Sequence, residues 1–406
     1  MKRPLDFVHI ADLHLGYAQY NLEARLLDFN RAFEEAVDKI LDIKPDFVLI
    51  CGDLFHHPRP SNVVLEFAIE QLCRLKAAGV PVLAVDGSHD SAPNSVTGTI
   101  LRPLDRAGLV VHLPSKPGSC CEGDGYYVYG MGYLRGRSKE AVLEDYVRDF
   151  PPRPDPSKFN IMAFHFAVAH EAVGPPGAFG RVRPEALPRG FDYYAGGHVH
   201  RPLLIELAEL GLPGEGYLAY SGSTETVNYR EAEHDKGFYL VSVSADKEIE
   251  VERVRLESPR KFIVFEESIT GLSPPEATEL ILDRVKAMDE RDAILVPIIT
   301  GELPPGASLS EIDLTAIRMA ARLALAVRPV LKVVEAELPE LVLPEEREDI
   351  RKRAYRHMIE IFKGKGVKEP EKLAEVAIEL IEPLLTGDEE RVKALLEGLA
   401  REDQGG

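Results

Sequence analysis

Aspartate and histidine side chains follow a series of apolar segments in a fixed order along the chain. The segments FVHIA, DFVLIC, PVLAV and FNIMAF, and the shorter FDYYAG, have the composition of buried strands. After them come Asp12 with His14, Asp53, the run Ser88–His89–Asp90, His165, and His198 with His200. Strands of one sheet bring the side chains at their C-terminal ends into one crevice. The order therefore predicts a centre for two divalent ions about 3.5–4 Å apart, which needs a bridging carboxylate, several imidazoles and an open side.

The first half of the chain alternates predicted strands and helices. Helices are expected over residues 21–43 and 63–79, between strands at 7–11, 46–51 and 80–87, with Gly79 ending the second helix. This βαβαβ rhythm predicts a largely parallel sheet covered by helices. Five further short strands are expected over residues 126–133, 160–166, 216–223, 237–243 and 248–256. We expect these five to form a second sheet packed face to face with the first.

The chain has 406 residues, which is more than one ordinary core accommodates, and its hydrophobic content of 45% indicates a well-packed globular protein. A boundary is expected near Ser258–Lys261. A compact small α/β domain should follow, with strands at 262–267, 293–302 and 330–337 and helices at 274–288 and 312–324. Only helices are expected after that, over 354–362, 372–385 and 392–400. The predicted parts are residues 1–258, 259–340 and 341–406, and the fold class is α/β.

Composition limits the partners and the location of the protein. The net charge of −19 argues against nonspecific electrostatic binding of nucleic acid over the whole surface, although metal ions and a local basic patch still permit a nuclease. No run of about 18 apolar residues exists, so no transmembrane helix is expected. The N-terminus lacks a signal-peptide core, and no CxxC spacing occurs among the four cysteines. These features favour a reduced, cytoplasmic setting.

The predicted ligands indicate a metal site only when they are taken together. Asp12 and His14 lie two residues apart, so in extended backbone their side chains would point the same way and chelate one ion. Asp53 follows Gly52 on a turn and is the natural bridging carboxylate. Each motif alone is common and usually marks a turn, whereas their combination in this order is specific. His9 is expected to be a packed strand residue. The histidines not expected to be ligands are His112, His170, His234 and His357.

The chain resembles the calcineurin-like metallophosphoesterases, whose motifs are D-x-H, G-D, G-N-H-[DE], a strand-end His and G-H-x-H. Within that superfamily, HIADLHLGYAQYNL, GDLFHHPRPS, YSGSTETVNYRE and KGFYLV resemble the break-repair nucleases of the meiotic recombination eleven and SbcD family. The resemblance covers roughly residues 5–260. It implies a nuclease domain of two sheets over 1–258, a DNA-capping domain over 259–340, and a helical segment over 341–406 that holds a Rad-fifty-type ATPase.

The resemblance also implies roles for individual residues. One Mn²⁺ ion would be held by Asp12, His14, Asp53 and His200. The second would be held by Asp53, His165, His198 and the residue at position 88. His89 would face the scissile phosphate, and Asp90 would orient His89 through its second ring nitrogen. The residues that would reach DNA are His56, His57 and Arg59. Further loop arginines that could contact phosphates are Arg102, Arg181, Arg183, Arg201 and Arg230.

Ser88 departs from the family pattern, which has asparagine at this position. A serine hydroxyl is shorter than the asparagine amide and a weaker neutral donor. Three interpretations are open: ligation through a water, a weakly bound second ion, or a silenced site. We favour a second site that is retained but weaker, because every other ligand is present.

The resemblance implies a manganese-dependent DNA exonuclease and endonuclease that processes double-strand breaks with an SMC-like ATPase, and that forms a homodimer through helices of its phosphoesterase domain. Two alternatives stay open. One is a DNA-end-binding scaffold subunit whose catalysis is weak because of Ser88. The other is a small-molecule phosphodiesterase or phosphatase of the same superfamily, although such enzymes have no need of a capping domain or helical tail.

Overall fold

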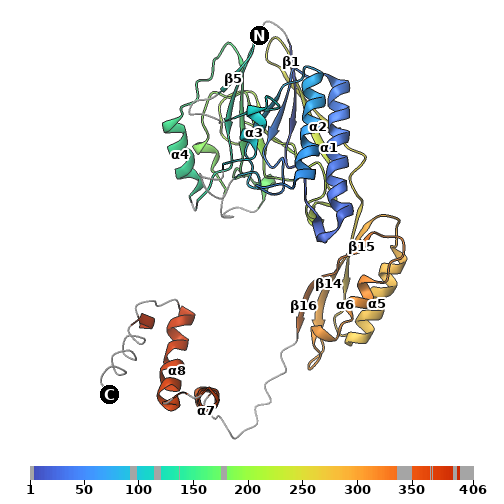
Figure 1. The fold of residues 1–406 in the computed structure, drawn as a ribbon, viewed down its shortest axis with the longest axis vertical. Helices are drawn as coiled ribbons and strands as arrows, with labels where there is room; N and C mark the ends of the chain where they lie inside the picture. The colour runs from blue at the N-terminus through green and yellow to red at the C-terminus, as the bar shows by residue number, and fades with distance from the viewer. Residues whose placement is uncertain are drawn as a thin grey trace. The chain divides into compact units, whose positions relative to one another are not determined.

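The computed structural model describes residues 4–91, 98–113, 120–136, 138–174, 181–335, 350–365, 367, 369–386 and 391–393. The chain forms two compact units, Met1–Ala336 and Glu337–Gly406. The described residues of the first unit form three sheets and their covering helices (Figure 1). They also form five one-turn 3-10 helices: η1 (Gln19–Asn21), η2 (Glu171–Val173), η3 (Pro184–Ala186), η4 (Tyr229–Glu231) and η5 (Leu309–Glu311).

The first sheet has six strands in the order β12-β11-β1-β2-β3-β4. Their bounds are β1 (Leu5–Ile10), β2 (Phe47–Cys51), β3 (Val82–Val85), β4 (Val111–His112), β11 (Gly237–Val243) and β12 (Ile249–Arg255). The strands β1 to β4 are parallel, as the βαβαβ rhythm predicts. The helices between them are α1 (Glu23–Ile43), α2 (Asn62–Ala77) and α3 (Leu101–Arg106). The helix α1 lies beside α2, and α2 ends before Gly79, whose φ of 76° gives the expected helix stop.

The second sheet also has six strands, in the order β5-β6-β7-β8-β10-β9. Their bounds are β5 (Cys120–Glu122), β6 (Tyr126–Met131), β7 (Phe159–His165), β8 (Tyr193–Gly197), β9 (Leu203–Glu206) and β10 (Tyr217–Tyr220), with α4 (Lys139–Asp149) between β6 and β7. The assignment of residues 237–243 and 248–256 to this sheet was wrong. They form β11 and β12, and β11 extends the first sheet by antiparallel pairing with β1.

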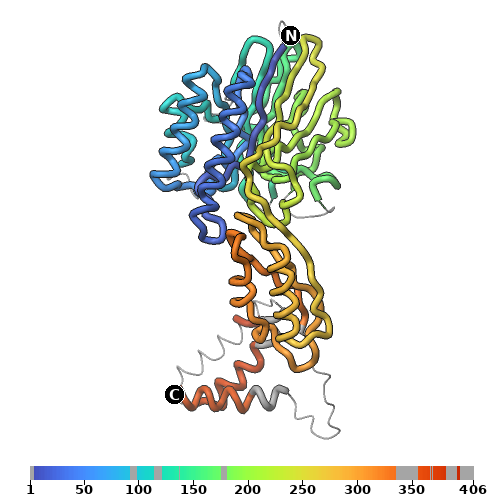
Figure 2. Tube along the Cα trace, turned by 90° about the vertical axis from the view of Figure 1, so that its right-hand side faces the viewer, coloured from blue at the N-terminus to red at the C-terminus, as the bar shows by residue number. Residues whose placement is uncertain are grey.

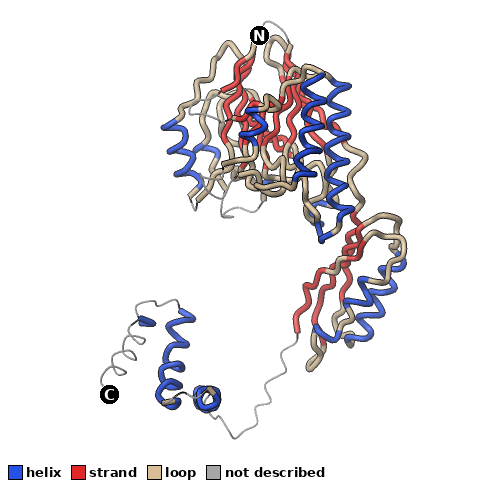
Figure 3. Tube along the Cα trace, in the orientation of Figure 1, coloured by secondary structure: helices blue, strands red, loops and turns tan. Residues whose placement is uncertain are grey.

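Three apolar layers hold the two sheets and their helices together. The first lies between the sheets and includes Phe7 and Leu49 of one sheet and Ile161 of the other. A second layer joins the first sheet to α1 and α2, and a third covers the outer face of the second sheet. Because neighbouring residues of a strand point to opposite faces, Phe7 enters the layer between the sheets and Val8 the helix-facing layer. Figure 3 shows the strands between helices on both sides, which confirms the α/β sandwich.

The third sheet belongs to the same unit and forms the small α/β domain. Its strands are β13 (Phe262–Ser268), β14 (Ile294–Leu303), β15 (Ala326–Val327) and β16 (Val330–Glu335), and its helices are α5 (Pro274–Ala287) and α6 (Leu314–Arg318). The helix expected over 312–324 is shorter than predicted. The carboxylate of Asp289 accepts hydrogen bonds from the backbone N–H groups of Arg322, Leu323 and Ala324, which holds this segment in a loop.

The second unit contains α7 (Ile350–Gly364) and α8 (Pro370–Thr386), visible at the red end of the chain in Figure 2. These two helices pack on each other, and Lys363 forms an ion pair with Glu371 at 2.9 Å. Most of the third predicted helix, 392–400, lies outside the described residues. In the described part of the chain, no helix is both long enough and apolar enough to cross a membrane.

Candidate metal centre

The predicted ligands gather where the ends of strands from two sheets meet. Asp12, Asp53 and Ser88 follow β1, β2 and β3 of the first sheet. His165 ends β7 and His198 follows β8, both in the second sheet. The expectation that strands of one sheet supply the whole set was therefore wrong. The two sheets lie face to face, so their carboxyl ends contribute to a shared edge.

The backbone around the ligands is left-handed rather than extended. The φ angles are 55° at Asp12, 48° at His14, 52° at Asp53 and 84° at His198. The prediction of extended backbone at Asp12 and His14 was wrong, although the two side chains still reach one cluster. Non-glycine residues in this region cost of order 1–3 kcal/mol each and occur mainly where function requires them. A Cβ on Gly197 would lie 1.9 Å from the carbonyl oxygen of Cys51, so only glycine fits before His198.

One cluster combines Asp12, His14 and His200. The Nε2 atoms of the two imidazoles lie 3.3 Å apart, and Nε2 of His200 is 3.6 Å from Oδ1 of Asp12. Two ring nitrogens that face each other need either a shared proton or a cation between them. Burial holds the pKa of His14 well below its usual value, and the neighbouring His200 adds to this. A neutral His14 is the form that ligates a metal.

A second cluster combines Asp12, Asp53 and His165. Nδ1 of His165 is 2.8 Å from the carbonyl oxygen of Cys51, which makes it an N–H donor and directs Nε2 into the site. This buried Nε2 lies 3.2 Å from Oδ2 of Asp53. Burial alone would lower the pKa of His165, but the charge of Asp53 raises it to about 9. A proton on Nε2 therefore pairs with the Asp53 carboxylate when no metal is bound, and a metal ion held by the two groups would displace this proton.

His198 lies beside this second cluster. Its ring centroid is 5.3 Å from that of His165, and its backbone N–H donates to both carboxylate oxygens of Asp12 at 3.1 and 3.0 Å. Burial, with help from the charge on His165, lowers the pKa of His198 to about 3. The structure therefore brings His198 to the edge of the site as a neutral imidazole.

Ser88 and His89 contact the carboxylate of Asp53 from the loop after β3. The Ser88 hydroxyl donates to Oδ2 at 3.1 Å, and the backbone N–H of His89 donates to Oδ1 at 2.7 Å. Oδ2 is also the oxygen that faces His165. The hydroxyl at position 88 therefore lies beside the second cluster, bonded to the carboxylate of Asp53.

His56, rather than Asp90, holds the ring of His89. Nδ1 of His89 bonds to the carbonyl oxygen of His56 at 2.9 Å, and the two rings stack with centroids 4.6 Å apart. The prediction that Asp90 orients this ring was wrong. The buried carboxylate of Asp90 instead accepts the backbone N–H groups of Leu54, Phe55 and Gly87. Asp90 thus ties the loop after β2 to the loop after β3, because three N–H groups of those loops converge on it.

Several other predicted residues lie outside the clusters. His57 and Arg59 are exposed on the loop after β2, whereas His56 lies inside the site, 3.3 Å from His14 between their Nδ1 atoms. His9 is buried as expected, between the Tyr193 hydroxyl and the carbonyl oxygen of Gly196. Nε2 of His112 bonds to Asp86 at 2.7 Å and takes no part in the clusters.

Glu231 is a contributor that the sequence motifs did not identify. Its Oε1 accepts Nδ1–H of His200 at 2.8 Å, and its Oε2 accepts Lys236 at 2.9 Å. Burial alone would raise the pKa of Glu231, but the bonds to His200 and Lys236 lower it to about 2. The carboxylate therefore sets the tautomer of His200 and directs Nε2 into the site. Its segment, YSGSTETVNYRE, carried the family resemblance but indicated no role for it.

We expect Glu231→Gln to weaken divalent-ion binding by roughly 10–100-fold, because loss of the partner of a ligating imidazole typically has that effect. Isothermal titration with Mn²⁺ measures it. Glu233→Gln is the matched control, since Glu233 is an exposed carboxylate two residues away. Equal affinities in the two variants would contradict the role of Glu231.

Comparison with known proteins agrees with this geometry. The model of the calcineurin-like phosphoesterase family matches residues 5–202. The DNA double-strand break repair protein Mre11 of Methanococcus maripaludis is 31% identical over 270 residues, which is 64% of this chain and 69% of that protein. The proteins of the same name from Methanocaldococcus jannaschii and Methanopyrus kandleri are 34% and 33% identical, over 63% and 64% of this chain and 68% and 59% of theirs. This chain therefore belongs to the Mre11 family of DNA-repair nucleases, a group of metal-dependent phosphodiesterases with the calcineurin-like fold.

Proposed function

We propose that this chain is a manganese-dependent DNA exonuclease and endonuclease that processes double-strand breaks together with an SMC-like ATPase of the Rad-fifty type. The observation that carries the proposal is the buried cluster of Asp12, Asp53 and His165, in which Nε2 of His165 lies 3.2 Å from Oδ2 of Asp53. Two buried carboxylates beside an imidazole need cations to compensate their charge, and metal ions can take the place of protons there. A mixture of carboxylates and imidazoles suits manganese or iron better than magnesium alone.

The residues present fit two ions. Asp12, His14 and His200 would hold the first, and His165, His198 and Ser88 the second, with Asp53 between them. When bound, such a pair supplies a nucleophile at neutral pH and neutralises the charge of a phosphodiester. The protein keeps His14 and His198 neutral for ligation by burying them. Glu231 and the carbonyl oxygen of Cys51 fix the tautomers of His200 and His165.

His89 is the proposed group that acts on the substrate. Its Nδ1 is engaged by the carbonyl oxygen of His56, so Nε2 is the nitrogen left to face the site. From there it can donate a hydrogen bond to a phosphoryl oxygen or a proton to the leaving oxygen. Asp90 supports this arrangement by holding the loops that carry His56 and His89. His57 and Arg59, exposed on the same rim, are proposed to contact DNA.

The second unit is proposed to bind the ATPase. Among the described residues of α7 and α8, the apolar side chains Met358, Ile359, Phe362, Val376 and Ile378 are only half-buried, and Ile361 is 43% exposed. Apolar helix faces that stay partly exposed in a two-helix unit favour docking into a hydrophobic groove of a partner protein. Leu27 of α1 and Val63 of α2 are also exposed, at 46% and 70%, and support a homodimer formed through these helices.

We expect wild-type protein to bind one Mn²⁺ tightly and a second more weakly, and Ser88→Asn to tighten the weaker ion by roughly 10–100-fold. The reason is that an amide oxygen reaches further and is a stronger ligand than the hydroxyl now bonded to Asp53. Titration calorimetry with Mn²⁺ counts the ions. Cleavage of single-stranded and duplex DNA by both proteins tests the activity. Two equally tight sites in the wild type would contradict the weaker second site.

The same assays separate the alternative functions. A scaffold subunit would bind DNA ends and the ATPase, while neither wild type nor Ser88→Asn cleaved DNA. A small-molecule phosphodiesterase would hydrolyse p-nitrophenyl phosphate esters without cutting DNA. The nuclease requires Mn²⁺-dependent cleavage that His89→Ala removes.

A further inference from the structure

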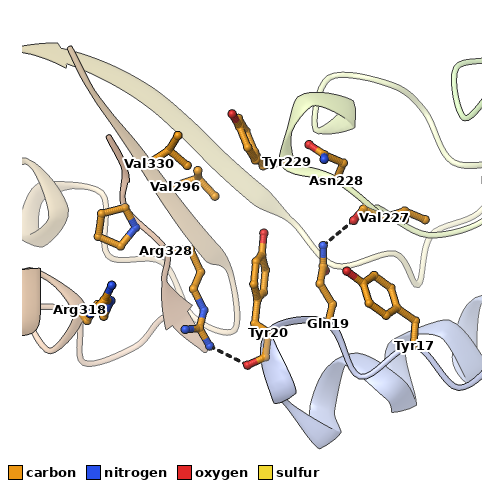
Figure 4. A pocket seen from close by; sticks show the side chains of 11 residues that line it. Tyr17, Gln19, Tyr20, Val227, Asn228, Tyr229, Val296, Arg318, Arg328 and Val330 are labelled. Atoms are coloured by element: carbon orange, nitrogen blue, oxygen red, sulfur yellow. Dashed lines mark hydrogen bonds between the residues drawn. The ribbon is translucent and has the colours of Figure 1, made fainter. Parts of the chain in front are cut away.

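A pocket of about 360 Å³ lies between the phosphoesterase sheets and the third sheet. It is lined by Tyr17, Gln19, Tyr20, Val227, Asn228, Tyr229, Val296, Arg318, Arg328, Pro329 and Val330. Figure 4 shows Tyr20 between Arg328 and Gln19, and Tyr229 above it, between Val296 and Asn228. The volume falls in the range of about 300–1,000 Å³ typical of small-ligand sites.

Aromatic rings form one part of this pocket. Tyr20 and Tyr229 pack against the buried residues Phe262, Ile294 and Val296, which gives each ring a fixed support. Tyr20 is held at φ 61°, a left-handed conformation that bulky residues rarely adopt. Strain of this kind is maintained where the direction of a side chain matters. The rings are therefore held in place beside an open cavity.

Cationic groups form another part. Arg328 donates to the carbonyl oxygen of Tyr20 at 3.1 Å, and its guanidinium lies 4.9 Å from the Tyr20 ring centroid. Its Nε is buried without a hydrogen-bond partner. Arg318, the last residue of α6, is exposed at the rim. Among the described lining residues none is acidic, in a chain whose net charge is −19. The lining thus suits an anion that carries a flat ring.

The pocket is connected to the metal centre in two ways. Tyr17 stacks on His56 with centroids 3.8 Å apart, and His56 stacks on His89. The one-turn helix η4 carries Tyr229 at its start and Glu231, the partner of His200, at its end. The pocket and the metal centre therefore share supporting residues and lie next to each other.

We propose that this pocket binds one unpaired nucleotide of the substrate strand, with its base on Tyr20 and Tyr229 and its phosphate at Arg318 and Arg328. Bases stack on aromatic side chains whatever their sequence, and arginines track the backbone. The proposal rests on the nuclease function and sharpens it: the preferred substrate is an end with an unpaired tail rather than a blunt duplex.

The test compares a fluorescent blunt hairpin with the same hairpin carrying a four-thymidine tail of either polarity, bound to full-length protein in EDTA. Wild type should bind one tailed hairpin about fivefold or more tightly than the blunt one, as the stacking of one base implies. Tyr229→Leu and Arg318→Glu should remove this advantage, and Tyr229→Phe should keep it. Arg291→Glu is the charge-matched control, because Arg291 is an exposed arginine of the same domain outside the pocket.

A wild type without preference for a tail, or variants that keep it, would overturn the proposal. Thymidine monophosphate separates a strand site from a site for free nucleotides. If it quenches tyrosine fluorescence in a Tyr229-dependent way but leaves the tail advantage intact, the pocket serves free nucleotides and the strand assignment fails.

Mn²⁺-dependent cleavage of the blunt hairpin is measured in parallel. Its absence in the wild type counts against the nuclease, whereas cleavage without a tail advantage counts only against the pocket.

Discussion

Asp53→Asn should reduce Mn²⁺-dependent DNA cleavage by about 10³-fold or more and abolish tight binding of both ions. Oδ2 of Asp53 lies 3.2 Å from Nε2 of His165 and 3.9 Å from Nε2 of His14, so one carboxylate serves both clusters. An amide keeps the shape and the bond from the His89 N–H but removes the charge between two cations. Several kcal/mol of transition-state stabilisation depend on those cations, and about 1.4 kcal/mol corresponds to tenfold in rate.

Single-turnover cleavage of end-labelled duplex DNA and metal analysis of the purified variant measure this effect. Asp86→Asn is the matched control. It removes a carboxylate just after the neighbouring strand β3. This carboxylate bonds to His112 and Thr99 and belongs to neither metal-ligand cluster. Cleavage by Asp86→Asn should stay within about tenfold of wild type. If Asp53→Asn retained two tight ions, the bridging role would be wrong.

The residue types of the site were predictable because they are local features of the sequence. A run of apolar residues that is followed by Asp or ends in His predicts a buried strand with a ligand at its end, whatever the rest of the chain does. Asp12, Asp53 and His165 were identified in this way, and the structure brings them into one cluster. The strands β1, β2 and β3 were predictable for the same reason, since helices alternate with them.

Sheet membership was not predictable from the strands themselves. Residues 237–243 of β11 alternate in a way that suits either sheet, because Phe238 enters the helix-facing layer and Val241 the layer between the sheets. Pairing with β1 decides the outcome, and the paired residues, from Leu5–Val243 to His9–Tyr239, lie 230 or more positions apart. Long-range pairing of this kind leaves no local signal.

The supporting contacts of the site were not predictable either. His89 and Asp90 are neighbours in the sequence, which suggested that Asp90 orients the His89 ring. The backbone after β1 and β2 is left-handed, and groups from another loop contact the ring instead. The carbonyl oxygen of His56 reaches His89, and Asp90 turns to the backbone instead. Glu231 accepts a hydrogen bond from His200, 31 residues away in the sequence. It lies in a one-turn helix, which is too short to show a pattern of apolar residues.

A buried ion network joins the phosphoesterase sheets to the third sheet. Arg25 of α1 is fully buried and contacts Asp28 at 2.6 Å and Glu225 at 3.2 Å. Its guanidinium also lies 5.2 Å from the ring of Phe262, the first residue of β13. Arg260, in the segment between β12 and β13, donates to Asp28 and, through its backbone N–H, to Glu225. Because both carboxylates are buried, their charges depend on these two arginines.

Arg25→Met should therefore lower the free energy of unfolding by about 3–5 kcal/mol, since removing one partner leaves buried charge uncompensated. Urea denaturation followed by tyrosine fluorescence measures it, because the chain has 14 tyrosines and no tryptophan. Arg31→Met is the control: Arg31 also pairs with Asp28, at 3.4 Å, but its side chain is 54% exposed, so the loss should stay below about 1 kcal/mol. Adding Glu225→Gln to Arg25→Met should recover part of the stability, because it removes one of the stranded charges. Equal losses for Arg25→Met and Arg31→Met would show that the network contributes no more than a surface ion pair.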